Sequence, residues 1–71
     1  MDEKRALEIY KIWLDEQERL EPYIPIRHMA DKTGLGHGTL QQAVKILVRL
    51  NKAEPVANGE RGMRKRYRML K

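Results

Sequence analysis

The sequence has no cysteine, no serine and no long apolar run, and these absences exclude several kinds of protein. Without cysteine, neither a disulfide framework nor a cysteine-based zinc site is possible. The longest apolar stretch is three residues, and no basic segment precedes a hydrophobic run. We therefore expect no membrane-spanning helix, no secretory signal and no membrane partner, but a soluble, cytoplasmic protein.

Residue patterns typical of enzymes are also missing. The sequence contains no nucleophile elbow, no pair of acids in a plausible pocket and no glycine-rich phosphate loop with its lysine, although residues 34–38 superficially resemble one. His28 and His37 have no cysteine or suitably spaced carboxylates near them, so we interpret both as surface residues. We predict no catalytic residue, no metal site, no cofactor and no small-molecule ligand, and hence no enzyme.

The length of 71 residues limits the core that the chain can form. A domain of this size buries only about 60% of the surface that its unfolded chain exposes, so self-association would add useful burial. Charged residues make up 35% of the sequence, yet leucine, isoleucine and valine recur with clear periods, which argues against disorder. We predict one folded domain over residues 1–71.

Charge is distributed unevenly along the chain. Up to Lys32 there are six basic and eight acidic residues, a net charge of −2, whereas from Thr33 onward nine basic residues face two acids, a net of +7. No acid lies between Lys32 and Glu54. A basic surplus carried by ordered elements indicates a polyanionic partner and favours duplex DNA.

The apolar spacing of the first half predicts a long helix followed by a break. Over about residues 2–18, apolar residues recur at steps of three and four. Pro22 and Pro25 follow and leave at most a short strand at Tyr23 and Ile24. Pro25 also suits the first position of a second helix.

Two further helices are predicted, each with a left-handed residue at its end. The second spans about residues 26–33 and precedes Gly34, and the third spans about residues 37–50 and can be closed by Asn51. The buried stripe of the third helix is expected to comprise Leu40, Ala43, Val44, Leu47 and Leu50. Its opposite, acid-free arc comprises Gly38, Gln41, Gln42, Lys45 and Arg49.

After Lys52 the pattern changes to a period of two. Residues 53–70 predict a two-stranded β-hairpin that turns at Asn58-Gly59. Tyr67 and Met69 alternate with basic residues on the second strand, so these two side chains should face the helices. The fold class is therefore α+β and mainly α.

The chain resembles the winged helix-turn-helix regulators of bacteria and archaea. The resemblance rests on the order of elements and on the run Ile26-Arg27-His28-Met29-Ala30-Asp31-Lys32-Thr33-Gly34-Leu35-Gly36-His37-Gly38-Thr39-Leu40. It continues at Ala43, Leu47, Leu50 and Asn51 and from Gly62 to Met69. MarR-like and GntR-like DNA-binding segments look most similar. The resemblance implies a small prokaryotic, viral or plasmid regulator in which the hairpin is the wing.

In such a fold the third helix is the recognition helix and enters the major groove of DNA. Glutamine can bond bidentately to adenine, and lysine or arginine can reach guanine or phosphate. The expected base contacts are Gln41, Gln42 and Lys45, and Arg49 is an expected backbone contact. Near the start of the helix, His37, Gly38 and Thr39 are expected beside a phosphate.

The wing is the second candidate contact with DNA. Arg61 lies at its expected tip and Arg64, Lys65 and Arg66 follow, so the wing could enter the minor groove or lie along the phosphates. The alternative is a charged edge strand, in which basic residues prevent aggregation between sheets.

The leading hypothesis is a sequence-specific double-stranded DNA-binding protein that regulates transcription. Because one small module makes few base contacts, we expect a homodimer on two half-sites, joined through Ile9, Ile12 and Trp13 of the first helix. Trp13 and Tyr10 are also assigned to the core, and Tyr10 or Ile12 could be shared with the partner. Two alternatives stay open: a winged helix that binds an acidic protein within a larger assembly, and an architectural protein that binds DNA of any sequence. RNA is less well supported, because only Tyr67 supplies an aromatic ring near the basic residues.

Overall fold

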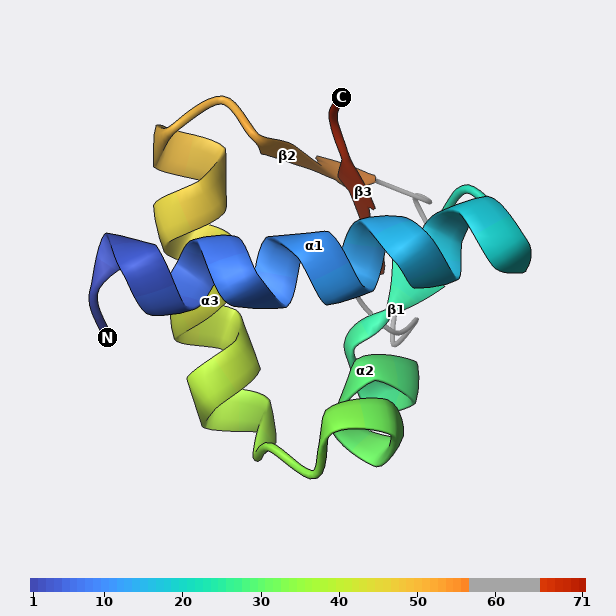
Figure 1. The fold of residues 1–71 in the computed structure, drawn as a ribbon, viewed down its shortest axis with the longest axis horizontal. Helices are drawn as coiled ribbons and strands as arrows, with labels where there is room; N and C mark the ends of the chain where they lie inside the picture. The colour runs from blue at the N-terminus through green and yellow to red at the C-terminus, as the bar shows by residue number, and fades with distance from the viewer. Residues whose placement is uncertain (57–65) are drawn as a thin grey trace.

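Three helices and a three-stranded antiparallel sheet make up the fold (Figure 1). The computed structural model describes residues 1–56 and 66–71. Its elements are α1 (Glu3–Arg19), β1 (Ile24–Pro25), α2 (Ile26–Thr33), α3 (His37–Arg49), β2 (Ala53–Val56) and β3 (Arg66–Met69). The chain is thus α+β and mainly α, and each helix begins and ends within one residue of its predicted range.

Helix α1 lies across the other elements and contacts both α3 and β3 (Figure 1). It is capped by Asp2, whose carboxylate accepts a hydrogen bond of 2.8 Å from the backbone N–H of Arg5. Ala6, Ile9 and Trp13 recur at helical spacing and are all buried. This stripe fixes which face of α1 covers the core.

Left-handed residues end α2 and α3, as the sequence predicts. Gly34 has φ 77° after α2, and Asn51 has φ 60° after α3. At the second of these ends, the N–H of Asn51 bonds the carbonyl of Val48 at 3.0 Å, and the N–H of Lys52 bonds that of Leu47 at 2.7 Å. The carbonyls of Leu47 and Val48 are therefore satisfied before the chain enters β2.

Strands β2 and β3 pair antiparallel, as the prediction expects, and β1 adds a third strand to the sheet, in the order β1-β3-β2. Ile24 pairs with Tyr67 and Pro25 with Arg66, so β1 occupies the edge of β3 that β2 leaves open. Pro25 is extended, with ψ 155°, and α2 begins only at Ile26. Pro25 is thus the residue that precedes the helix, and α2 keeps its predicted range. The predicted turn at residues 58–59 lies outside the described residues.

A side chain of α1 extends the pairing of β3 beyond the end of β1. The Gln17 amide donates to the carbonyl of Met69 at 3.0 Å and accepts from its N–H at 2.7 Å. One residue further, the hydroxyl of Tyr10 donates to the carbonyl of Leu70. Helix α1 thereby holds the end of the chain against the core.

The core lies between α1, α3 and the sheet. Trp13 is fully buried and meets Tyr67 edge to face, with ring centroids 6.0 Å apart. Met69 is also buried, so Tyr67 and Met69 face the helices as predicted. The stripe of α3 differs from the prediction at two positions: Ile46 is buried, and Leu50 is only half-buried.

The burial of α1 corrects part of the predicted dimer contact. Ile9 is 2% exposed and Trp13 is 0% exposed, because both side chains are inside the core of a single chain. Neither can present its side chain to a partner. Ile12, the third predicted contact, is 41% exposed.

Candidate nucleic-acid interface

Helix α3 has one buried face and one polar face. Leu40, Ala43 and Leu47 are completely buried, which fixes the rotation of the helix about its axis. The opposite side is exposed at every predicted position, namely Gly38, Gln41, Gln42, Lys45 and Arg49. The structure therefore brings the predicted recognition residues together on one accessible surface.

The start of α3 is open to the solvent. Gly36 precedes the helix in an extended conformation, and no side chain caps the backbone N–H groups of the first turn. No acid lies in that turn, His37 and Gly38 are exposed, and Thr39 is half-buried. Uncapped N–H groups at a helix N-terminus are suited to bind an anion.

A buried carboxylate ties α1 to α2, the helix that precedes α3. Glu16 is 5% exposed; its Oε1 lies 2.7 Å from Nε2 of His28, and its Oε2 lies 3.4 Å from Nζ of Lys32. The hydrogen bond with His28 lowers the pKa of Glu16, burial opposes this change, and Lys32 reinforces it. His28 is thus a half-buried partner of Glu16, which corrects its interpretation as a simple surface residue.

The sequence contains a signal for this cluster that our interpretation missed. Glu16 continues the spacing of Ile9 and Trp13 along the buried stripe of α1. His28 and Lys32 are four residues apart and share one face of α2. An acid on an apolar stripe, opposite two bases at helical spacing, is a pattern that predicts a buried ion pair.

The predicted wing residues fall into two groups. Arg61, Arg64 and Lys65 lie outside the described residues. Arg66 lies in β3, where its guanidinium is 2.8 Å from a carboxylate oxygen of Glu21 and donates to the carbonyl of Tyr23 at 3.0 Å. Arg66 therefore links β3 to the segment before β1.

The positive charges of β3 and α3 differ in their surroundings. Arg66 pairs with Glu21 and Arg68 with Glu54 on β3, and Lys71, which follows this strand, pairs with Glu18. Over residues 1–56 and 66–71, by contrast, no carboxylate lies within ion-pair distance of Lys45 or Arg49. Lys45 and Arg49 are therefore available to a polyanion, whereas Arg66, Arg68 and Lys71 are already paired with carboxylates.

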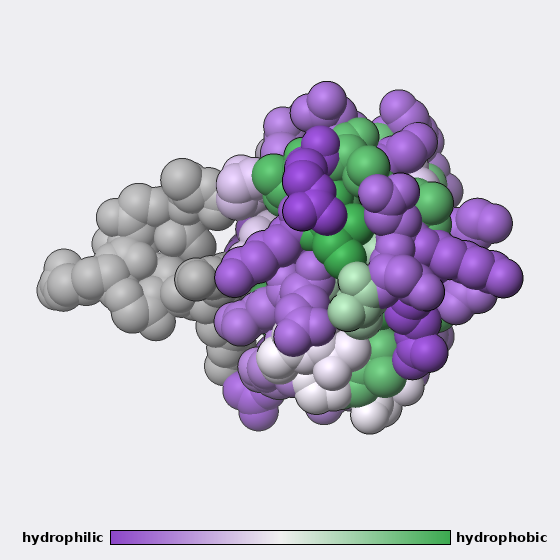
Figure 2. Space-filling view, turned by 90° about the vertical axis from the view of Figure 1, so that its left-hand side faces the viewer, coloured by the Kyte–Doolittle hydropathy of each residue, from purple (hydrophilic) through white to green (hydrophobic). Residues whose placement is uncertain are grey.

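A groove of about 420 Å³ runs beside α3, between this helix and the sheet. We call it the α3 groove; it is lined by Gln41, Val44, Lys45, Val48, Pro55 and Tyr67. Val48 lies next to the polar face of the helix and is 37% exposed, although its side chain is apolar. Figure 2 shows, on the side of the molecule that carries α3 and the N-terminus, apolar side chains gathered between polar ones. Val48 is not among the predicted DNA contacts of α3, which are polar residues and Gly38.

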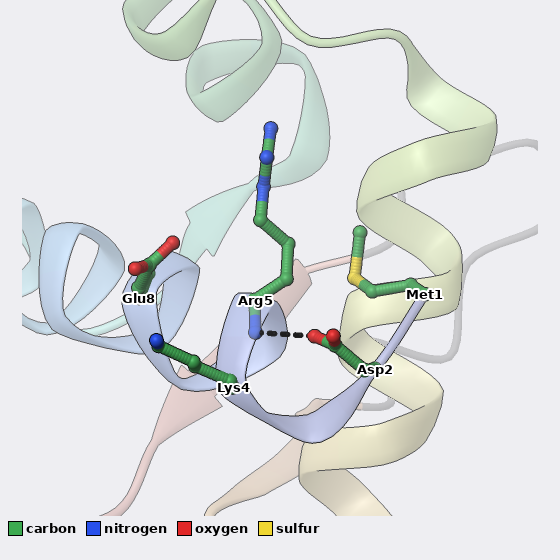
Figure 3. Close-up of a pocket in the computed structure, with 5 residues that line it drawn as sticks. All are labelled: Met1, Asp2, Lys4, Arg5 and Glu8. Carbon is green, nitrogen blue, oxygen red and sulfur yellow. Dashed lines mark hydrogen bonds between the residues drawn. The ribbon is translucent and has the colours of Figure 1, made fainter.

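Two other hollows adjoin α1. One is lined by Met1, Asp2, Lys4, Arg5 and Glu8 (Figure 3). There Asp2 bonds the backbone of Arg5, whose guanidinium points away from it, so the hollow is the cap of the helix. The other, of about 430 Å³, lies beside Ile12 and is also lined by Arg5, Glu8, Ile9, Lys32, Thr33 and Leu35.

Within the described part of the chain, no three histidine, cysteine, aspartate or glutamate residues are grouped so that they could hold a metal ion. None of the helices found there has the length and apolar character needed to cross a bilayer. Comparisons with protein families, curated proteins and solved structures find no match for this chain. Any function must therefore be argued from the residues and their geometry.

Proposed function

We propose that this chain is a winged helix-turn-helix protein that binds double-stranded DNA sequence-specifically and regulates transcription in the cytoplasm. The observation that carries the proposal is the outward face of α3, on which exposed Gln41, Gln42, Lys45 and Arg49 gather without an acid. A helix anchored by a buried stripe can present such a face rigidly to the major groove.

Each side chain on this face has a specific task in the proposal. Gln41 and Gln42 can each bond N6 and N7 of an adenine, and Lys45 can reach guanine or a phosphate. Arg49 contacts the DNA backbone. At the start of α3, His37, Gly38 and Thr39 lie beside a phosphate, whose oxygens accept hydrogen bonds from the backbone N–H groups of the first turn.

The wing supplies the second contact, with the minor groove or the backbone of DNA. Arg61, Arg64 and Lys65 are its proposed residues. Arg66 contributes less than these three, because it is already paired with Glu21 and must give up this pair to reach a phosphate.

The chain acts as a homodimer in this proposal, because two copies double the few base contacts of one module. Of the predicted contact residues, Ile12 is the exposed one, and the hollow beside it extends the apolar surface. Sedimentation of the free and the DNA-bound protein at micromolar concentration tests this part. A monomer in both states would contradict it.

The deciding experiment is selection of bound duplexes from a random pool, followed by affinity measurements on the winners and on bulk DNA. A regulator is expected to select one sequence, arranged as an inverted repeat if it is dimeric, with at least a thousandfold advantage. Equal, salt-sensitive affinity for all sequences would indicate an architectural protein. No binding at low salt, together with a stoichiometric protein partner, would indicate a protein-interaction module.

A further inference from the structure

Val48 is an apolar exception on the accessible side of α3. It is the one large apolar side chain of this fully described helix that is markedly exposed. Val48 follows Gln41 by seven residues and therefore lies on the same flank of the helix. With Val44 and Pro55 it gives the α3 groove an apolar wall, and Gln41, Lys45 and Tyr67 line the rest of it.

An apolar wall of this kind matches one feature of duplex DNA. The base edges in the major groove display hydrogen-bond donors and acceptors, and their one apolar group is the C5-methyl of thymine. Against any other base edge, Val48 would remove water from a polar group without replacing its hydrogen bond, which is unfavourable.

We propose that the α3 groove receives the C5-methyl group of a thymine and that Val48 makes this base part of the preferred site. The inference rests on the proposed function and specifies one base that the protein reads. Lys45 supports it, because its positive charge beside the groove attracts the DNA strand that carries the base.

The spacing along α3 limits where the thymine lies. Gln41 and Val48 are seven residues apart, which is about 10 Å along a helix axis. This distance equals about three base-pair steps of 3.4 Å. The thymine is therefore expected within about three base pairs of the base that Gln41 contacts, in the same half-site.

The test uses deoxyuridine, which pairs like thymine but lacks the methyl group. Each thymine of the selected duplex is replaced singly, and affinity is measured for the wild type and for Val48→Ala. The wild type is expected to bind about fourfold more weakly at one such position, as for one buried methyl group. Val48→Ala should bind the two duplexes equally.

Two further variants make the test specific. Val48→Thr keeps the shape of the side chain but replaces a methyl by a hydroxyl, and it should also reduce the preference for thymine. Leu20→Ala is the matched control, because Leu20 is 60% exposed and does not line the α3 groove. This control should retain the fourfold difference.

Two results would overturn the inference about Val48 but not the proposed function. One is equal wild-type affinity for thymine and deoxyuridine duplexes at every position. The other is a difference in affinity between these duplexes that is as large in Val48→Ala as in the wild type. Both are compatible with sequence-specific binding, so they leave the proposed function standing. Failure to select any duplex would overturn the proposed function and the inference together.

Discussion

The salt dependence of duplex binding should separate the cations of α3 from those that are paired elsewhere. Each cation that neutralises a phosphate releases counterions and contributes about −0.9 to the slope of log K against log salt. Lys45→Ala should therefore make the slope shallower by about 0.9. Between 50 and 200 mM salt, this loss corresponds to a change of about 3.5-fold in the ratio of affinities. Arg49→Ala should have an effect of the same size.

Lys71→Ala is the matched control, since it removes the same charge from a lysine that is paired with Glu18. Its slope should equal that of the wild type. The assay is fluorescence anisotropy of a labelled duplex over a series of salt concentrations, with circular dichroism to verify that each variant is folded. If Lys71→Ala and Lys45→Ala reduced the slope equally, the argument that Lys45 neutralises a phosphate and the paired Lys71 does not would be refuted.

Three further predictions concern stability. Leu47→Ala removes a completely buried side chain and should lower the free energy of unfolding by about 2–5 kcal/mol in urea denaturation. Asn51→Ala should cost about 1 kcal/mol, because alanine resists a φ of 60°, whereas Asn51→Gly should not lower the melting temperature. The pKa of Glu16 lies below its ordinary value of 4.5, chiefly through the hydrogen bond with His28. The stability that Glu16 contributes should therefore be complete above about pH 4.5 and be lost as the pH falls through the lowered pKa. In urea denaturation at acid pH, the free energies of unfolding of Glu16→Gln and the wild type should therefore become equal.

Each of these predictions can fail in a distinct way. A loss below about 1 kcal/mol for Leu47→Ala would contradict its central place in the packing. Equal destabilisation by alanine and glycine at position 51 would show that backbone conformation is not the cause. If the free energies of unfolding of Glu16→Gln and the wild type differed by the same amount from neutral to acid pH, this would contradict the ionised pairing of Glu16.

Local sequence was sufficient to predict the helices and the polar face of α3. Apolar residues at steps of three and four indicate which side of a helix is buried, and hence that Gln41 and Lys45 on the opposite side are exposed. Gly34 and Asn51 mark helix ends because they adopt left-handed conformations more readily than most residues. These signals act within a few residues along the chain, so they can be read without the fold.

Other features were decided by tertiary contacts. The third strand exists because Ile24 meets Tyr67, and the pairing of Gln17 with Met69 joins residues that are 52 positions apart. The pairing of Arg66 with Glu21 likewise spans 45 positions. No local spacing encodes which distant groups will meet.

The sequence by itself therefore determined the helices, their ends and the positive, acid-free face of α3. Only the tertiary structure decided that Ile9 belongs to the core and not to a dimer contact, that Arg66 pairs with Glu21, and that Val48 lines a groove. The physical reason is that periodicity and conformational preference are local properties. Burial and charge pairing, in contrast, depend on which elements pack together.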